Sequence, residues 1–244
     1  MSARSLVRVA VLALSLVLAG SGCAGFLPGK GSGTGGHATV WITKNRGAQL
    51  VRAGRVRAGQ TLMRALGSLA PVDTRYGGRY VQSIDGVSGS ASAQRDWFWF
   101  VNGLLGDTSA AEYRLHPGDV AWWDYRAWGK DYGTDVVVGA FPEPFLHGFD
   151  GRVRPAAVRY APSLRSGAER VAELLHARSV RPLGEPVAAN ANVFRLVTGP
   201  RRFVAAFRTP GSGPDGAVVF TYSGPVGELL PGGGRPYLRR FSLP

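Results

Sequence analysis

An aromatic stretch from Trp97 to Trp128 constrains the fold of this chain more than any other feature. It contains five of the six tryptophans in the sequence. Rings alternate along residues 97–101 with the period of two expected of a β-strand, which places large side chains on both faces. Asn102-Gly103 tolerates positive φ and predicts a hairpin turn, and a second aromatic strand begins at Val120. Strands that are apolar on both faces must pack against other parts of the protein on both faces, or must leave one aromatic face for a ligand.

The residues around this stretch predict an α+β fold. Strands are expected at residues 38–43, 50–56 and 79–84. Thr61 is expected to cap a helix that runs to Leu69, because apolar residues follow one another there at spacings of three and four. The order ββαβββ suggests a β-grasp-like domain over residues 38–150, in which a curved sheet wraps one helix. The proline-containing segment 136–145 is expected to act as an ordered strap that closes this domain or joins it to the second half.

Residues 151–244 predict a second, small and basic α+β domain. Strands are expected at 153–160, 193–197, 203–207, 218–222 and 237–241, the second and third forming a hairpin. A capping box at Ser166–Glu169 predicts the start of a helix. This half carries 14 arginines and five acidic residues, a net charge of +9, whereas residues 38–150 carry only +1. Such a surface suits anionic lipid headgroups or anionic wall polymer; the alternative is the ordinary solvated surface of an arginine-rich chain.

The first 22 residues predict a signal peptide. Arg4 and Arg8 form a basic region before an apolar run of ten residues, 9–18, that is too short to span a bilayer comfortably. Cys23 is the only cysteine in the chain, and its place directly after small residues resembles a lipobox. We therefore expect residues 23–37 to form a flexible, lipid-anchored linker, and the protein to be extracytoplasmic on the outer face of the cytoplasmic membrane. Gly20 departs from the usual aliphatic residue of a lipobox, so an ordinary signal peptide with an incidental cysteine is the alternative.

The motifs of the aromatic stretch resemble a family of extracytoplasmic domains. These motifs are W-x-W-x-V-N-G from Trp97, A-E-Y-x-L from Ala111 and P-G-D-V from Pro117. The family is similar to the C-terminal domain of transcobalamin and intrinsic factor, the vitamin B12 carriers, and the resemblance covers residues 37–128. It implies that the hairpin loop at 103–107 contacts a ligand, here cobalamin or a related small molecule. The carriers complete their site with a large helical domain that has no counterpart in this sequence, so that half of the site is either missing or supplied by a partner protein.

The candidate ligand-binding residues combine the aromatic cluster with this hairpin. Tryptophan offers a large rigid apolar surface and one N–H donor at low entropic cost. The four histidines are too dispersed in sequence to indicate a metal site, and no G-x-S-x-G elbow is present; we therefore expect neither a metal nor an enzyme. Leu104 and Leu105 are expected at an exposed hairpin tip, where they would contribute little to folding. The predicted site residues are Trp97, Trp99, Asn102, Leu104, Leu105, Asp107, Tyr113 and Trp122.

These observations predict a non-catalytic, membrane-anchored module that binds a ligand or serves a membrane transporter as an accessory protein. The alternative is a structural or protein-interaction module at the cell surface, with the Trp-rich hairpin as its interface. A hydrolase of wall polymer is a further alternative that no catalytic motif favours. A nucleic-acid partner is not expected for an exported chain. An aromatic cleft would favour ligand binding, and a flat exposed patch would favour a protein partner.

Overall fold

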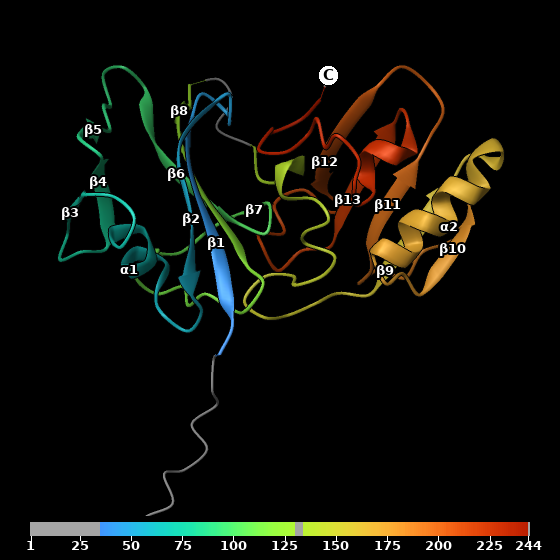
Figure 1. Cartoon of the computed structure of the whole chain (residues 1–244), viewed down its shortest axis with the longest axis horizontal. Helices are drawn as coiled ribbons and strands as arrows, with labels where there is room; N and C mark the ends of the chain where they lie inside the picture. The colour runs from blue at the N-terminus through green and yellow to red at the C-terminus, as the bar shows by residue number, and fades with distance from the viewer. Residues whose placement is uncertain (1–34, 130–133, 244) are drawn as a thin grey trace, which may run out of the picture. The chain divides into compact units, whose positions relative to one another are not determined.

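The computed structural model describes residues 35–129 and 134–243 (Figure 1). The predicted signal peptide, Cys23 and most of the predicted linker lie outside the described residues. Mixed sheets with few helices confirm the broad α+β class, while the finer β-grasp assignment stays a prediction. Within the two described ranges, no helix is long and apolar enough to cross a membrane.

The first sheet has the strand order β2-β1-β8-β6-β7. Its central pair, β1 and β8, is parallel, and the other neighbours are antiparallel. Across β6 and β8, Trp99 pairs with Trp123 and Phe100 pairs with Trp122. Because successive side chains point to opposite faces of a sheet, the tryptophans are divided between the two faces. The strands are β1 (His37–Lys44), β2 (Gln49–Arg57), β6 (Arg95–Val101), β7 (Leu104–Leu105) and β8 (Val120–Ala127).

Helix α1 (Leu62–Gly67) covers one face of this sheet. The Thr61 hydroxyl accepts a hydrogen bond from the Arg64 N–H at 3.2 Å, as the sequence predicts for an N-cap. Leu62 and Leu66 are fully buried in the same core as Trp99 and Trp123. A small antiparallel sheet of β3 (Val72–Arg75), β4 (Tyr80–Ile84) and β5 (Val87–Ser88) lies beside the helix (Figure 1). The sequence predicts β4 but not β3.

The other face of the first sheet is covered by the end of the chain itself. Phe241 makes edge contacts with Phe100 and Trp122, with ring centroids 5.3 and 5.2 Å apart. Val137 and Ala140, from the segment around the 3-10 helix η1 (Val138–Ala140), complete this cluster. The face that carries Phe100 and Trp122 is therefore buried within the chain.

The segment predicted as a closing strap packs against the second half. The Phe141 ring lies 5.3 Å from Phe194 and 5.4 Å from Phe203, and Phe145 lies 5.2 Å from Phe220. Because these rings share one buried cluster with the core of the first sheet, residues 135–149, called the strap from here on, link the two sheets. The domain boundary at residue 150 stays a prediction.

The second sheet has the order β10-β9-β11-β13-β12, with four parallel strands and one antiparallel edge strand. The predicted hairpin of residues 193–197 with 203–207 is wrong, because β13 inserts between β11 and β12. Strand β11 is buried except at Arg195, so it needs a neighbouring strand on each side. The parallel strands β9 and β13 are these neighbours. The elements are β9 (Ala156–Tyr160), α2 (Arg165–Leu174), β10 (Ser179–Pro182), β11 (Asn192–Leu196), β12 (Arg202–Phe207) and β13 (Val218–Ser223).

Two further predictions for the second half are wrong. Helix α2 follows the 3-10 turn η2 (Pro162–Leu164) and has Leu164 at its N-cap with no side-chain cap, so Ser166 lies inside the first turn and forms no capping box. Residues 237–241 form turns and not a strand. The chain reaches the second sheet after them, through a bridge between Leu243 and Phe203. A last 3-10 helix, η3, spans Val226–Leu229.

Candidate functional site

A hollow of about 450 Å³ lies between the α1-facing side of the first sheet, α1 and β4. Trp97, Trp99 and Trp123 line it from β6 and β8. The loop 105–110 forms a second wall, and Met63 and Val81 line the hollow from α1 and β4. Because the strand pairing aligns Trp99 with Trp123, the sheet itself fixes the spacing of these indoles.

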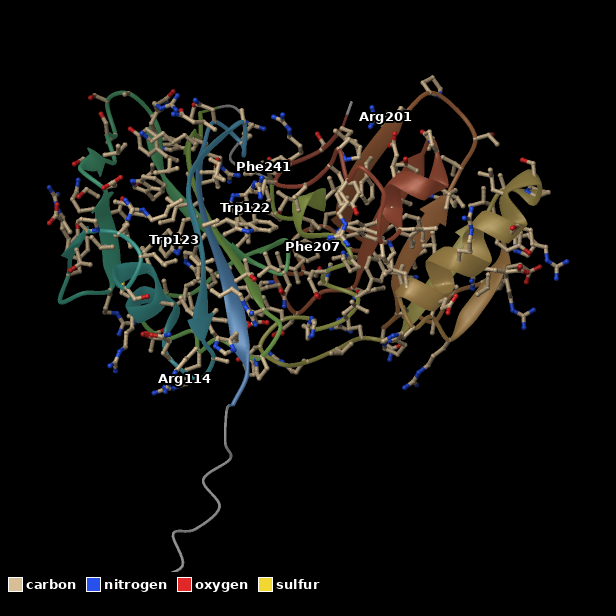
Figure 2. All side chains as sticks on the ribbon, in the orientation of Figure 1. Arg114, Trp122, Trp123, Arg201, Phe207 and Phe241 are labelled. Carbon is tan, nitrogen blue, oxygen red and sulfur yellow. The ribbon has the colours of Figure 1, made fainter. Side chains whose placement is uncertain are left out.

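The three indoles differ in what their N–H groups do. Nε1 of Trp97 donates to the Val87 carbonyl at 2.7 Å, which ties this ring to β5. Trp123 is 2% exposed, and its Nε1 has no hydrogen-bond acceptor among the described residues. Trp122, its neighbour in sequence, points to the opposite side of the sheet and donates to the Thr43 hydroxyl at 2.7 Å (Figure 2). A buried donor without an acceptor costs about 1–3 kcal/mol, so an acceptor brought by a bound molecule would stabilise the site.

The loop 105–110 is fixed against Trp99 by a glycine. The Gly106 N–H donates to the Trp99 carbonyl at 3.0 Å. A Cβ added at Gly106 would lie 2.1 Å from the Trp99 ring, so only glycine allows this approach. The loop also holds α1, because the Met63 N–H donates to the Ala110 carbonyl at 2.9 Å. The wall of the hollow is therefore built into the fold.

The rim of the hollow is polar. Arg79 forms an ion pair with Glu112, and the Ser109 hydroxyl donates to the Arg79 carbonyl at 2.6 Å. The Tyr80 hydroxyl donates to Asp96. Burial, together with this hydrogen bond, raises the pKa of Tyr80 to about 12, so the phenol stays neutral at physiological pH. Asp107 is exposed at the edge.

Four of the eight predicted site residues line this hollow: Trp97, Trp99, Leu105 and Asp107. The sequence analysis did not include Trp123 among the site residues. The alternation of side chains along residues 120–125 could have indicated it, because Trp123 lies opposite Trp99 in the neighbouring strand. The sequence analysis also missed Met63 and Tyr80, which come from elements more than 15 residues away in sequence. Whether these side chains bind a ligand stays a prediction.

Asn102 and Tyr113 belong to a buried hydrogen-bond network and not to the hollow. Asn102 is fully buried; its Nδ2 donates to Asp119 Oδ1 at 2.8 Å and to the Gly148 carbonyl at 2.7 Å, and its Oδ1 accepts from the Val120 N–H at 2.8 Å. The Tyr113 hydroxyl donates to Asp119 Oδ2 at 3.2 Å and accepts from the backbone of Asp150 at 3.1 Å. Burial raises the pKa of both Tyr113 and Asp119. These groups connect the hairpin to the strap.

The last two predicted residues also lie elsewhere. Trp122 is fully buried on the opposite face of the sheet. Leu104 is 2% exposed and pairs with Val101 in β6 and with Val136 of the strap. The exposed tip expected for Leu104 is therefore wrong, because the strap lies against β7.

Metal ligands do not gather in the described part of the chain. In residues 35–129 and 134–243, no three His, Cys, Asp or Glu side chains lie close enough together to hold an ion. His147 Nδ1 and Glu143 Oε1 form a pair 2.5 Å apart. This pair orders the strap.

Comparison with known proteins adds a family match for part of the chain. Residues 59–127 match the model of a family described as a domain of unknown function, DUF4430. This range runs from the start of α1 to the end of β8 and includes every residue that lines the hollow. No curated protein sequence matches the chain. A matching crystal structure is that of "a putative metal binding protein from Ruminococcus gnavus ATCC 29149", at 20% identity and a TM-score of 0.32, covering 38% of this chain and 97% of that one.

Proposed function

We propose that the chain is a non-catalytic binding module that holds a flat, largely apolar group of a small molecule between Trp97, Trp99 and Trp123. The observation that carries the proposal is the hollow itself, lined by three indoles, one of which has an N–H with no acceptor in the described part of the chain. Its volume of about 450 Å³ falls within the roughly 300–1,000 Å³ of ordinary small-molecule sites. Such sites are mostly apolar with a few placed polar groups, as this one is.

The ligand class follows from the same geometry. Indole faces favour flat rings in offset or edge-on contact, and the buried Nε1 of Trp123 favours a hydrogen-bond acceptor on that ring. Cobalamin is the ligand implied by the resemblance of the aromatic motifs. A corrinoid is larger than this hollow, so only one edge of it would enter, and a partner protein would cover the rest. We infer that this partner is a membrane transporter or another surface protein.

Titration of the full chain with cobalamin, with binding measured by equilibrium dialysis, tests the proposal. We expect saturable binding that weakens about tenfold in Trp123→Phe, because this change keeps an aromatic ring but replaces the indole and so removes its N–H and one hydrogen bond worth roughly 1–1.5 kcal/mol. Trp41→Phe, on the opposite face of the sheet, is the matched control and should leave binding unchanged. If indole binds and cobalamin does not, the corrinoid is excluded as the ligand, and the hollow is still supported as a small-molecule site. Binding of neither would contradict the proposal.

A protein partner at the same place is the second candidate. Tyr76 is 76% exposed and lies beside Tyr80, with ring centroids 6.1 Å apart, and Tyr80 in turn lines the hollow. Exposed aromatic side chains next to a cleft are typical of interaction sites. A Tyr76→Ser variant that loses a cross-linked surface partner but still binds the small molecule would favour this second function.

The membrane anchor is a separate part of the proposal. It is supported by Cys23 alone, the single cysteine after a predicted signal peptide. Cys23→Ser should release the protein into the medium or leave the precursor uncleaved, as judged by fractionation and mass. A Cys23→Ser protein of mature mass in the membrane fraction would contradict lipidation.

A further inference from the structure

A second hollow of about 340 Å³ has Leu104 of β7 in its wall. Leu104 lines it, whereas the next residue, Leu105, lines the first hollow. The strap and the residues that precede β9, β11 and β13 form its remaining walls. No residue is shared between the two hollows, so the second could hold a ligand of a different kind.

Arg154 brings an oriented positive charge to this hollow. Its guanidinium donates to the backbone carbonyls of Asn190, at 3.3 Å, and of Asp215. No carboxylate forms an ion pair with it among the described residues, whereas the nearby Arg152 pairs with the Asp215 carboxylate at 2.7 Å. A guanidinium has five N–H donors, so Arg154 keeps free donors in a fixed direction.

Asn192 adds a buried donor. The residue is 2% exposed and lines the hollow at the start of β11. Its Oδ1 accepts a hydrogen bond from the Val218 N–H at 3.1 Å, which fixes the orientation of the amide. Its Nδ2 donates no hydrogen bond within the described part of the chain. Donating groups from two separate elements therefore line one cavity.

We propose that this hollow binds a small organic monoanion, a carboxylate with an apolar body. Arg154 and Asn192 Nδ2 would donate to the carboxylate, because charge-assisted hydrogen bonds to a guanidinium are strong and directional. Leu104, Phe149 and Pro155 would contact the apolar body. Arg152 and Asp215 also line the hollow and form an ion pair with each other. Arg154 is therefore the one lining cation without a carboxylate partner among the described residues, so a monoanion is favoured over a phosphate dianion.

Titration of the full chain with phenylacetate by calorimetry tests this proposal. We expect saturable binding at least tenfold tighter than that of the neutral phenylacetamide and of inorganic phosphate. Arg154→Gln should weaken phenylacetate binding at least tenfold. Asn192→Asp should do the same, because it keeps an oxygen for the Val218 N–H but turns a second oxygen toward the ligand anion.

Matched controls separate this site from general electrostatics and from the first hollow. Arg195→Gln removes an equal charge from an exposed position on β11 and should change affinity less than twofold. Trp123→Phe, in the first hollow, should also leave phenylacetate binding unchanged. The proposal is overturned if phenylacetate does not bind saturably, if phosphate binds more tightly, or if both Arg154→Gln and Asn192→Asp bind like the unaltered chain.

Discussion

At the scale of single residues, buried polar groups hold the aromatic hairpin in place. Asn102 adopts a φ of 54° and joins the end of β6 to Asp119 and to Gly148 of the strap. The sequence predicts the turn from the Asn-Gly pair, because positive φ is a local property. It cannot predict that the amide is used internally, because Gly148 lies 46 residues away. A ligand contact and a structural network look alike in the sequence.

Asn102→Asp tests that network. The new oxygen would face Asp119 Oδ1 and the Gly148 carbonyl, leaving a buried and repelled charge. We expect a loss of about 3 kcal/mol or more in the free energy of unfolding at pH 7, measured by chemical denaturation. Asn45→Asp makes the same change at an exposed residue with a φ of 55° and should cost far less. Equal losses in the two variants would mean that the network does not stabilise the fold.

His147 gives stability a pH dependence. A hydrogen bond to Glu143, supported by the charges of Glu143 and Asp119, raises the pKa of His147 above its ordinary value of 6.5, although burial acts against it. A histidine whose pKa is higher in the folded state than in the unfolded state stabilises the fold when it is protonated. This stabilisation is complete below the unfolded-state pKa and is lost as the pH rises through the folded-state pKa. The melting temperature of the unaltered chain should therefore exceed that of His147→Gln most below pH 6.5, and less as pH rises to 9. A constant difference over that range would contradict the pairing.

At the scale of elements, local patterns predict individual strands better than they predict strand neighbours. The sequence places β1, β4, β6, β8 and the helix α1 correctly, because period and capping are encoded in adjacent residues. The order β11-β13-β12 is not predicted, because parallel pairing depends on contacts between distant segments. In the same way, β7 is missed because the strap holds it: the Leu105 N–H donates to the Asp135 carbonyl, and the Val137 N–H donates to the Gly103 carbonyl.

The two leucines of β7 should now behave differently. Leu104→Ser places a hydroxyl at a site that is 2% exposed, and we expect a loss of about 2–4 kcal/mol in the free energy of unfolding. Leu105 is half-buried, packs against the cluster of Phe100 and Trp122 and also lines the first hollow, so Leu105→Ser should cost about 1 kcal/mol and weaken ligand binding. Thermal or chemical denaturation of the two single variants measures this contrast. Similar stability losses would show that both leucines belong to the core.

At the scale of the whole molecule, the sequence shows where the charge lies but not which residues bury the first sheet. The net charge of +9 is concentrated in residues 151–244, a division that composition alone reveals. Composition does not reveal what buries one face of the first sheet, because Phe241, which packs on that face, comes from the end of the basic half. The anionic lipid or wall polymer expected as a partner of that half stays a prediction. The sequence therefore predicts the electrostatic division of the chain but not its packing.

Phe241 makes the coupling of the two halves testable. Its ring contacts Phe100 and Trp122 of the first sheet, and two residues later Leu243 pairs with Phe203 of the second. Phe241→Ala should lower the free energy of unfolding by about 3–5 kcal/mol, the usual cost of removing a buried phenylalanine ring. Tyr76→Ala, at a ring that is 76% exposed, is the control and should cost little.

The decisive readout in Phe241→Ala is whether the two halves unfold together. Trp emission reports on the first sheet, which contains Trp41, Trp97, Trp99, Trp122 and Trp123, and amide exchange in β11 and β13 reports on the second. Because Phe141 and Phe145 place the strap in the core of the second sheet, we expect both reporters to shift by the same free energy in one transition. If the tryptophans unfold early while β11 and β13 keep their protection, the chain consists of two independent domains. In that outcome the predicted boundary at residue 150 divides the molecule, and the terminal aromatic cluster only caps the first sheet.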